Sequence, residues 1–133
     1  MRTALGRLSV ERGEALIDGL LALMLVLLVM AFGAQALAYA QARSVAEAAA
    51  EDGARRAATD GPEAGIARAA AMLDVAGGAG RGLHPSVREQ GDLVTVHVDG
   101  SAPRLFPVSL LLPAVHASAS LPVEQYPQAE AVP

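Results

Sequence analysis

The stretch GLLALMLVLLVMAFGAQALAYAQA, residues 19–42, decides how the rest of the chain can be organised. Its 24 residues carry no formal charge. A helix rises about 1.5 Å per residue, so the stretch would span about 36 Å, enough for a bilayer core of roughly 30 Å. Residues 20–30 are mostly Leu, Val and Met, which suit lipid, whereas residues 33–42 are mostly Ala and Gly, which permit close contact with other helices. We therefore predict a membrane-spanning helix.

The flanks of this stretch favour one orientation. Residues 1–13 form a short basic leader, and a positive flank before an apolar run normally stays in the cytoplasm. The far flank mixes arginines with acids, so the Lys/Arg difference across the stretch is small. We expect a single-pass protein of the cytoplasmic membrane, with its N-terminus inside and its C-terminal part outside.

Composition excludes several classes of function. The net charge of −4 gives no electrostatic support for nucleic-acid binding, and the absence of Cys excludes disulfides, thiol catalysis and Cys-ligated metals. The residues beyond the stretch, 43–133, are poor in aromatics and would bury a thin core. We therefore expect this part to rely on a long helix or on partners.

The helix is expected to continue beyond the membrane to form a stem over residues 14–58, because Ala and Glu are strong helix formers. Glu51→Arg55 and Asp52→Arg56 are spaced as i,i+4 ion pairs on this stem. Small residues form a second face of it: Ala42, Ala46, Ala49, Gly53 and Ala57. Two interpretations of this face stay open, a packing surface for another backbone and an ordinary alanine-rich helix with a solvated charged face.

The remaining residues, 59–133, predict a small α+β domain outside the membrane. The break at 59–62 precedes a second, short helix over 62–76, with Asp60 as its N-cap. Its apolar face would comprise Ile66, Ala69, Ala70, Leu73 and Ala76. The glycine-rich residues 77–82 lack the Gly-Lys-Ser/Thr of a phosphate-binding loop and are interpreted as a connector.

Alternating residues then predict an antiparallel sheet of about three strands. Residues 84–89 are a weak strand candidate, and residues 93–98 place Val94, Val96 and Val98 on one face. A turn is expected at Asp99-Gly100. Residues 101–113 hold three prolines and form an apolar connection that must cover the sheet, the stem or the membrane surface. Residues 114–124 alternate again, and a frayed tail is expected from about residue 125.

No constellation of residues points to catalysis. His84, His97 and His116 include two on strands that can pair, but close ligand spacing of the kind that zinc sites show is missing. We interpret them as surface histidines. The chain has no Gly-x-Ser-x-Gly motif. We expect no enzyme activity, no cofactor and no metal.

Acidic residues at the start of the membrane stretch are more informative. Glu14 and Asp18 lie four residues apart, and Asp18 directly precedes the apolar run. An ionisable group at that depth usually has a partner. The alternative is that both acids complement the helix dipole in the headgroup region.

These residues resemble the start of a type IV prepilin-like protein: Arg12-Gly13, then Glu14-Ala-Leu-Ile-Asp18, then an apolar helix. The stretch VAEAAAEDGAR, residues 45–55, and the strands that follow are similar to TadE-like proteins, minor pilins or pseudopilins of the Tad (Flp) pilus that are common in actinobacteria. The resemblance implies cleavage by a prepilin peptidase between Gly13 and Glu14. It also implies that Asp18, where most relatives have Glu, serves as the assembly acid. The partners it implies are other pilin-like subunits and the pilus assembly machinery.

A secreted or cell-surface binding module behind a removable signal peptide is the alternative. Residues 20–32 have the length of a signal-peptide core, and Ala36-Leu-Ala38, Ala38-Tyr-Ala40 and Ala40-Gln-Ala42 offer small-x-small cleavage sites. The unbroken alanine pattern through these sites favours the stem helix.

Overall fold

The computed structural model describes residues 2–106 and 112–124, with side chains from Arg12 onward. The chain divides into two compact units, Met1–Ala36 and Leu37–Pro133. The predicted tail from about residue 125, and residues 107–111 of the predicted apolar connection, lie outside the described residues.

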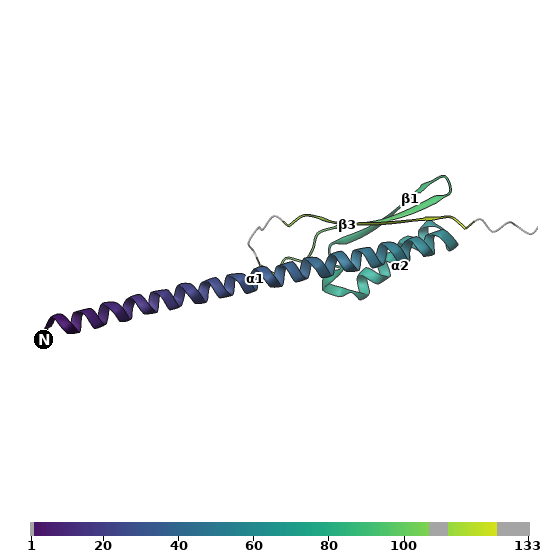
Figure 1. Ribbon diagram of the computed structural model, residues 1–133. Coiled ribbons are helices and arrows are strands. Elements are labelled where there is room, and N and C mark those ends of the chain that lie inside the picture. Colours follow the sequence, from purple (N-terminus) through teal and green to yellow (C-terminus); the bar gives the residue numbers. More distant parts are fainter. Residues whose placement is uncertain (1, 107–111, 125–133) are drawn as a thin grey trace, which may run out of the picture. The chain divides into compact units, whose positions relative to one another are not determined.

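Helix α1, Arg2–Asp60, contributes to both units (Figure 1). The predicted stem of residues 14–58 is therefore helical, and the helix also includes the predicted leader from Arg2. It ends because Gly61 has a φ of 97°, a value that residues with a Cβ rarely adopt, and because Pro62 cannot continue the ladder.

Helix α2, Pro62–Val75, follows this break, with Pro62 and Glu63 in its first turn. The prediction of Asp60 as its N-cap is wrong. Gly61 is the N-cap residue, and Asp60 ends α1, where its carboxylate forms an ion pair with Arg56. The side of α2 that is buried comprises Gly65, Ala69 and Leu73. Ala70, which was expected on this face, is exposed.

The short 3₁₀ helix η1, Gly77–Ala79, lies within the predicted connector and leads into three strands. These are β1, Leu83–Gln90; β2, Leu93–Gly100; and β3, Val115–Pro122. They form one antiparallel sheet in the order β1-β2-β3. The expected α+β fold with a three-stranded antiparallel sheet is thus confirmed. The expected turn at Asp99-Gly100 is wrong, because β2 continues through both residues and pairs with β1 and β3 there.

The hairpin between β1 and β2 is tight because only Gly91 and Asp92 lie between the paired residues Gln90 and Leu93. Gly91 has a φ of 60°, which the first position of a II′ hairpin turn requires. This turn fixes the register that places Val94, Val96 and Val98 on one face of the sheet, and all three are fully buried. The alternation predicted for β2 is confirmed.

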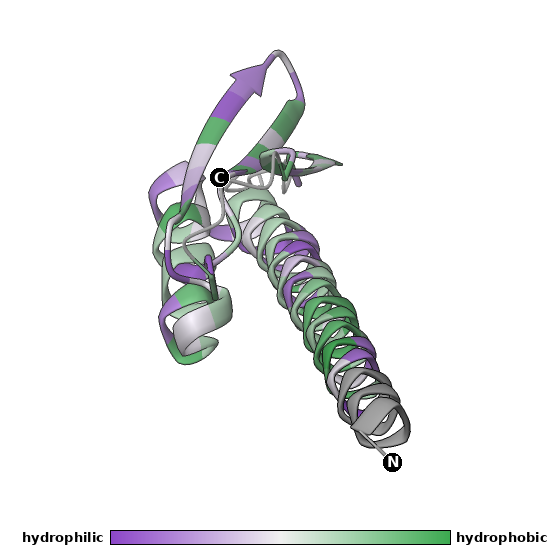
Figure 2. Ribbon diagram, turned by 90° about the vertical axis from the view of Figure 1, so that its left-hand side faces the viewer, coloured by the Kyte–Doolittle hydropathy of each residue, from purple (hydrophilic) through white to green (hydrophobic). Residues whose placement is uncertain are grey.

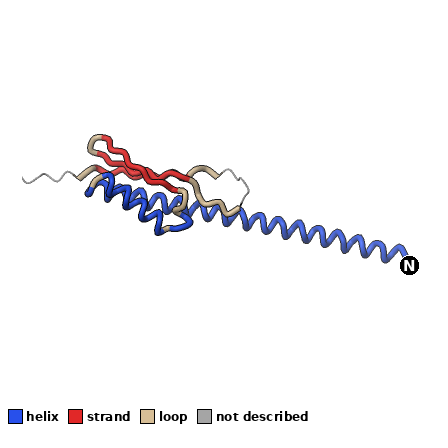
Figure 3. Tube along the Cα trace, turned by 180° about the vertical axis from the view of Figure 1, so that it is seen from behind, coloured by secondary structure: helices blue, strands red, loops and turns tan. Residues whose placement is uncertain are grey.

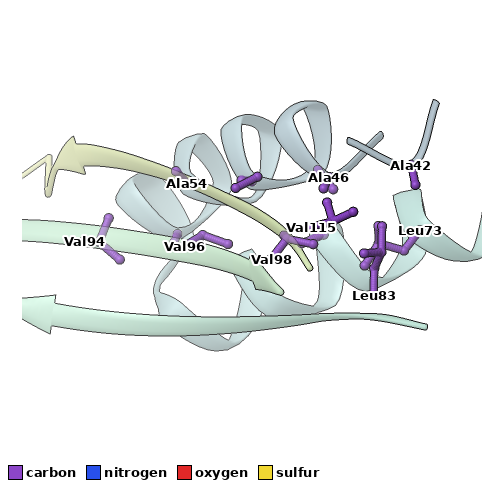
Figure 4. Packing of buried hydrophobic residues seen from close by; sticks show 14 of the residues in the cluster. Ala42, Ala46, Ala54, Leu73, Leu83, Val94, Val96, Val98 and Val115 are labelled. Carbon is purple, nitrogen blue, oxygen red and sulfur yellow. The ribbon is translucent and has the colours of Figure 1, made fainter. Parts of the chain in front are cut away.

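The core of the C-terminal unit lies between this valine face and the two helices. Residues 37–60 of α1 and the whole of α2 cover the same face of the sheet (Figures 1 and 3). Figure 4 shows the α1 alanines facing β-strand valines, with Ala54 near Val94 and Val96, and Ala42 near Leu73 and Leu83. Alanines on α1 and valines on β2 together make a thin core, so the layers must approach closely for their side chains to touch.

Candidate membrane anchor and packing surfaces

Most of the apolar stretch of α1 is exposed: every residue from 20 to 30 is exposed, whereas Gln35, Ala38 and Ala42 toward its end are buried. Exposed large apolar side chains follow one another along α1 from residue 16 to residue 37, and Figure 2 shows the hydrophobic colouring of this part of the helix. They are Leu16, Ile17, Leu20, Leu21, Leu23, Met24, Leu25, Val26, Leu27, Leu28, Val29, Met30, Phe32 and Leu37. Each would gain about 1.5–3 kcal/mol from leaving water. Among the described residues, α1 is the one helix long and apolar enough to cross a membrane.

The predicted processing residues Gly13 and Glu14 and the predicted assembly acid Asp18 lie on α1 just before this apolar stretch. Glu14 and Asp18 are both exposed, and a Cβ added to Gly13 would meet nothing within 4 Å. The Gly13–Glu14 peptide bond is inside the helix, so a peptidase that needs extended backbone would have to unwind it locally. Glycine lowers the cost of that unwinding by about 0.5–1 kcal/mol relative to Ala.

The predicted small-residue face of the stem is buried within the chain itself. All five of its members, Ala42, Ala46, Ala49, Gly53 and Ala57, are buried in the C-terminal unit. They pack against α2 and the sheet, so the face is occupied and is not available to another subunit. In the structure, the surface that these residues meet belongs to the same chain.

The closest approach of α1 and α2 involves a residue that the sequence analysis did not single out, Gly65. A Cβ built on Gly65 would lie 2.5 Å from the Cβ of Ala57 and 2.7 Å from the carbonyl oxygen of Gly53. A Cβ on Gly53 would lie 3.0 Å from the Cβ of Ala69. The spacing Gly65-x-x-x-Ala69, matched by Gly53-x-x-x-Ala57 on α1, is the sequence signal that could have identified this crossing.

The charged face of the stem forms ion pairs, one of which differs from the prediction. The described ion pairs of α1 are Arg43–Glu47 at 2.9 Å, Arg55–Glu51 at 3.7 Å, Arg56–Asp60 at 2.7 Å and Asp52–Arg68 at 2.5 Å. The expected Glu51–Arg55 pair is confirmed. The expected Asp52–Arg56 pair is wrong, because Asp52 reaches across to Arg68 of α2 and Arg56 turns to Asp60.

An open cleft of about 560 Å³ lies at this crossing, lined by Asp52, Arg55, Arg56, Thr59 and Arg68. Its three guanidinium groups suggest an anion site at first sight. Each of them is already paired with a carboxylate of α1. The cleft is therefore electrically balanced and offers an incoming anion little attraction.

The three histidines lie on the outer face of the sheet, opposite the valine face. His84, Asp99 and His116 form one cross-strand row. His97 lies on β2, two residues before Asp99. The Nδ1 atom of His116 lies 2.7 Å from an Asp99 carboxylate oxygen. In the described parts of the chain, no three His, Asp or Glu side chains are placed to hold a metal ion. This polar face reads as solvated sheet surface.

Comparisons of the chain with protein-family models, with curated proteins and with solved structures find no match. The resemblance to TadE-like proteins therefore stays a prediction, carried by the motifs at residues 12–18 and 45–55.

Proposed function

We propose that this chain is a TadE-like minor pilin or pseudopilin, a single-pass protein of the cytoplasmic membrane without enzymatic activity that takes part in assembling a Tad (Flp) type pilus. The observation that carries the proposal is the apolar part of α1 at residues 20–30, in which every residue is exposed while the C-terminal unit buries its own core. A soluble protein would leave that stretch in water at great cost. In a bilayer the same side chains are satisfied by lipid.

The arrangement of the stem supports this proposal over a cleaved signal peptide. The helix runs unbroken through the small-x-small sites of residues 36–42. Ala38 and Ala42 are buried in the C-terminal unit, and Tyr39 packs against its core. Cleavage after Ala40 or Ala42 would remove core residues from a unit whose core is already thin. A protein secreted in that way would lose part of its own stability.

Assembly in this proposal uses the apolar stretch, because the small-residue face is occupied within the chain. Pilin-like subunits would meet through residues 19–36 as they leave the bilayer. Cleavage after Gly13 would free an amino group at Glu14, about one helical turn from Asp18. The Asp18 carboxylate would pair with the amino terminus of a neighbouring subunit. In a low-dielectric bundle this pairing sets the register, since a misaligned subunit leaves both charges unpaired.

The mature N-terminus tests the proposal. Intact-mass measurement of the chain from cells that contain a prepilin peptidase should give a protein beginning at Glu14, and Gly13→Leu should remain uncut. Gly19→Leu, a matched control on the same helix, should be processed normally because a Cβ there also meets nothing within 4 Å. A mature protein beginning near Gln41 or Arg43 would instead establish the secreted module.

A further inference from the structure

The C-terminal unit has two ends that differ in their surface chemistry. Leu83, Gly100 and Val115 pair in one row at one end of the sheet, and Gln90, Leu93 and Pro122 pair in one row at the other. We call the first the proximal end. Ala42, which is near the start of the part of α1 that belongs to this unit, lies there beside Leu73 and Leu83 (Figure 4). At the distal end the Glu124 amide donates to the carbonyl oxygen of Ala58.

Three chain segments come together at the proximal end. Helix α2 runs back from Gly65, which contacts Gly53 and Ala57, to Leu73, so its last residue Val75 belongs to this end. The turn before β1 also lies here, because the amide of Ser101 donates to the carbonyl oxygen of Gly82. The connection that follows β2 leaves the sheet at the same end (Figures 1 and 3). The proximal end is therefore built from the end of α2, this turn and residues 101–106.

These segments expose large apolar side chains. Val75 is 89% exposed, Leu105 is 52% exposed and Phe106 is 42% exposed. The core of the unit is short of large side chains, yet these three are left on its surface. Such a concentration of apolar surface at one end of a small unit marks a contact with another apolar phase.

Arginines lie in the same segments. Arg81 is in the turn before β1, Arg104 directly precedes Leu105, and both are exposed. One exposed acid, Asp74, lies next to Val75. Together with Arg81 and Arg104 it leaves a net positive charge on these three residues. Apolar side chains beside arginines match the chemistry of a bilayer surface, where the former enter the acyl boundary and guanidinium groups bind lipid phosphates.

We propose that the proximal end seats in the surface of the bilayer, with Val75, Leu105 and Phe106 in the acyl–headgroup boundary and with Arg81 and Arg104 on anionic headgroups. This rests on the proposed membrane span. Residue 37 is the first of the unit and follows residue 36 of the proposed span along the chain, so the proximal end is the end of the unit that is joined to the span. The contact would hold the unit at a fixed depth above the membrane before assembly.

Single cysteines carrying an environment-sensitive fluorophore test this contact, because the chain has no cysteine of its own. The label is placed at Val75→Cys and at Phe106→Cys in the full chain, reconstituted into vesicles of phosphatidylcholine and phosphatidylglycerol. Leu93→Cys is the matched control, since Leu93 is 50% exposed but lies at the distal end. Leu25→Cys reports the span itself. Far-UV circular dichroism verifies that each variant is folded.

The expected result is blue-shifted emission at residues 25, 75 and 106, quenched by lipid-borne quenchers, and water-like emission at residue 93. Lipid-like emission at residue 25 with water-like emission at either residue 75 or residue 106 would overturn the contact and leave the span intact. Water-like emission at residue 25 would overturn the proposed function and the contact together. Blue-shifted emission at residues 75 and 106 that lipid quenchers do not reach would show a protein contact, for example with a second copy, and would also overturn the proposal.

The arginines are tested in the same system. Omitting phosphatidylglycerol should reduce the blue shift at residue 106, and Arg81→Gln with Arg104→Gln should abolish this dependence on lipid charge. Arg88→Gln, an exposed β1 arginine paired across the strands with Thr95, should leave the dependence unchanged. Equal shifts in both lipid mixtures for the unmodified arginines would overturn their assignment to headgroups.

Discussion

Replacing Gly65 by Ala should destabilise the C-terminal unit, although Ala is the better helix former. The added Cβ would lie 2.5 Å from the Cβ of Ala57 and 2.7 Å from the carbonyl oxygen of Gly53. Carbon atoms in contact are normally about 3.5–4.0 Å apart, so the two helices would have to separate by roughly 1 Å. Separation on that scale would loosen the contact of Gly53 with Ala69 and Val96 as well, because all of them meet at the same crossing.

The size of the effect follows from two opposing terms. Overpacking a well-filled core costs about 1–3 kcal/mol, and Ala in place of Gly within a helix returns about 0.5–1 kcal/mol. The expected net loss in the free energy of unfolding is therefore about 1–2 kcal/mol. For a unit of this size such a loss lowers the melting temperature by about 5–15 °C.

Thermal unfolding of the full chain in detergent micelles measures the loss, followed by far-UV circular dichroism and by hydrogen exchange of the β2 amides. The exchange readout is needed because the apolar part of α1 stays helical in a micelle. Gly33→Ala is the control: Gly33 is a helical glycine of α1 at which a Cβ meets nothing within 4 Å, so the melting temperature should not fall.

A double-mutant cycle tests the steric reason itself. Ala57→Gly removes the atom nearest to the new Cβ, so Gly65→Ala combined with Ala57→Gly should lose less stability than the two single changes added together, with a coupling of about 0.5–3 kcal/mol. A melting temperature for Gly65→Ala equal to or above that of the unmodified chain would refute the close helix crossing. Simple additivity in the cycle would refute the role of Ala57 in it.

Three further changes address the sheet, the span and the helix crossing. Val96→Asp should unfold the C-terminal unit, since an unpaired charge in a fully buried site costs more than about 4 kcal/mol, whereas Thr95→Asp on the opposite face should be mild; equal losses on thermal unfolding would contradict the alternation. Asp18→Ala should leave membrane insertion and processing intact but reduce crosslinking to pilus subunits, and Asp18→Glu should be tolerated. Full crosslinking of the Asp18→Ala variant would mean that Asp18 only complements the dipole of its own helix. Asp52→Asn, which breaks the ion pair with Arg68, should cost no more than about 1 kcal/mol because the Arg68 side chain is 54% and the Asp52 side chain 31% exposed, and a larger loss in denaturant unfolding would show a structural pair.

Local chemistry in the sequence determined most of the secondary structure. The uncharged residues 19–42 and the Ala- and Glu-rich residues after them required a long helix, and Gly61-Pro62 required its end. Alternating Val94, Val96 and Val98 required a strand with one buried face. These signals are readable because each depends on backbone preference or on a periodicity within one element.

Only the tertiary structure decided what these faces meet. The five small residues on the stem signalled close packing, but an alanine carries no information about its partner, and the partner proved to be the chain's own α2 and sheet. Asp52 had two arginines within reach, Arg56 along the helix and Arg68 across it, and the nearness of α2 selected the second. The row of His84, Asp99 and His116 likewise depends on how β1 and β3 each pair with β2. Periodicity within an element tells which side of it is covered, whereas the covering surface comes from residues distant in the sequence, and its choice depends on how closely two backbones can approach.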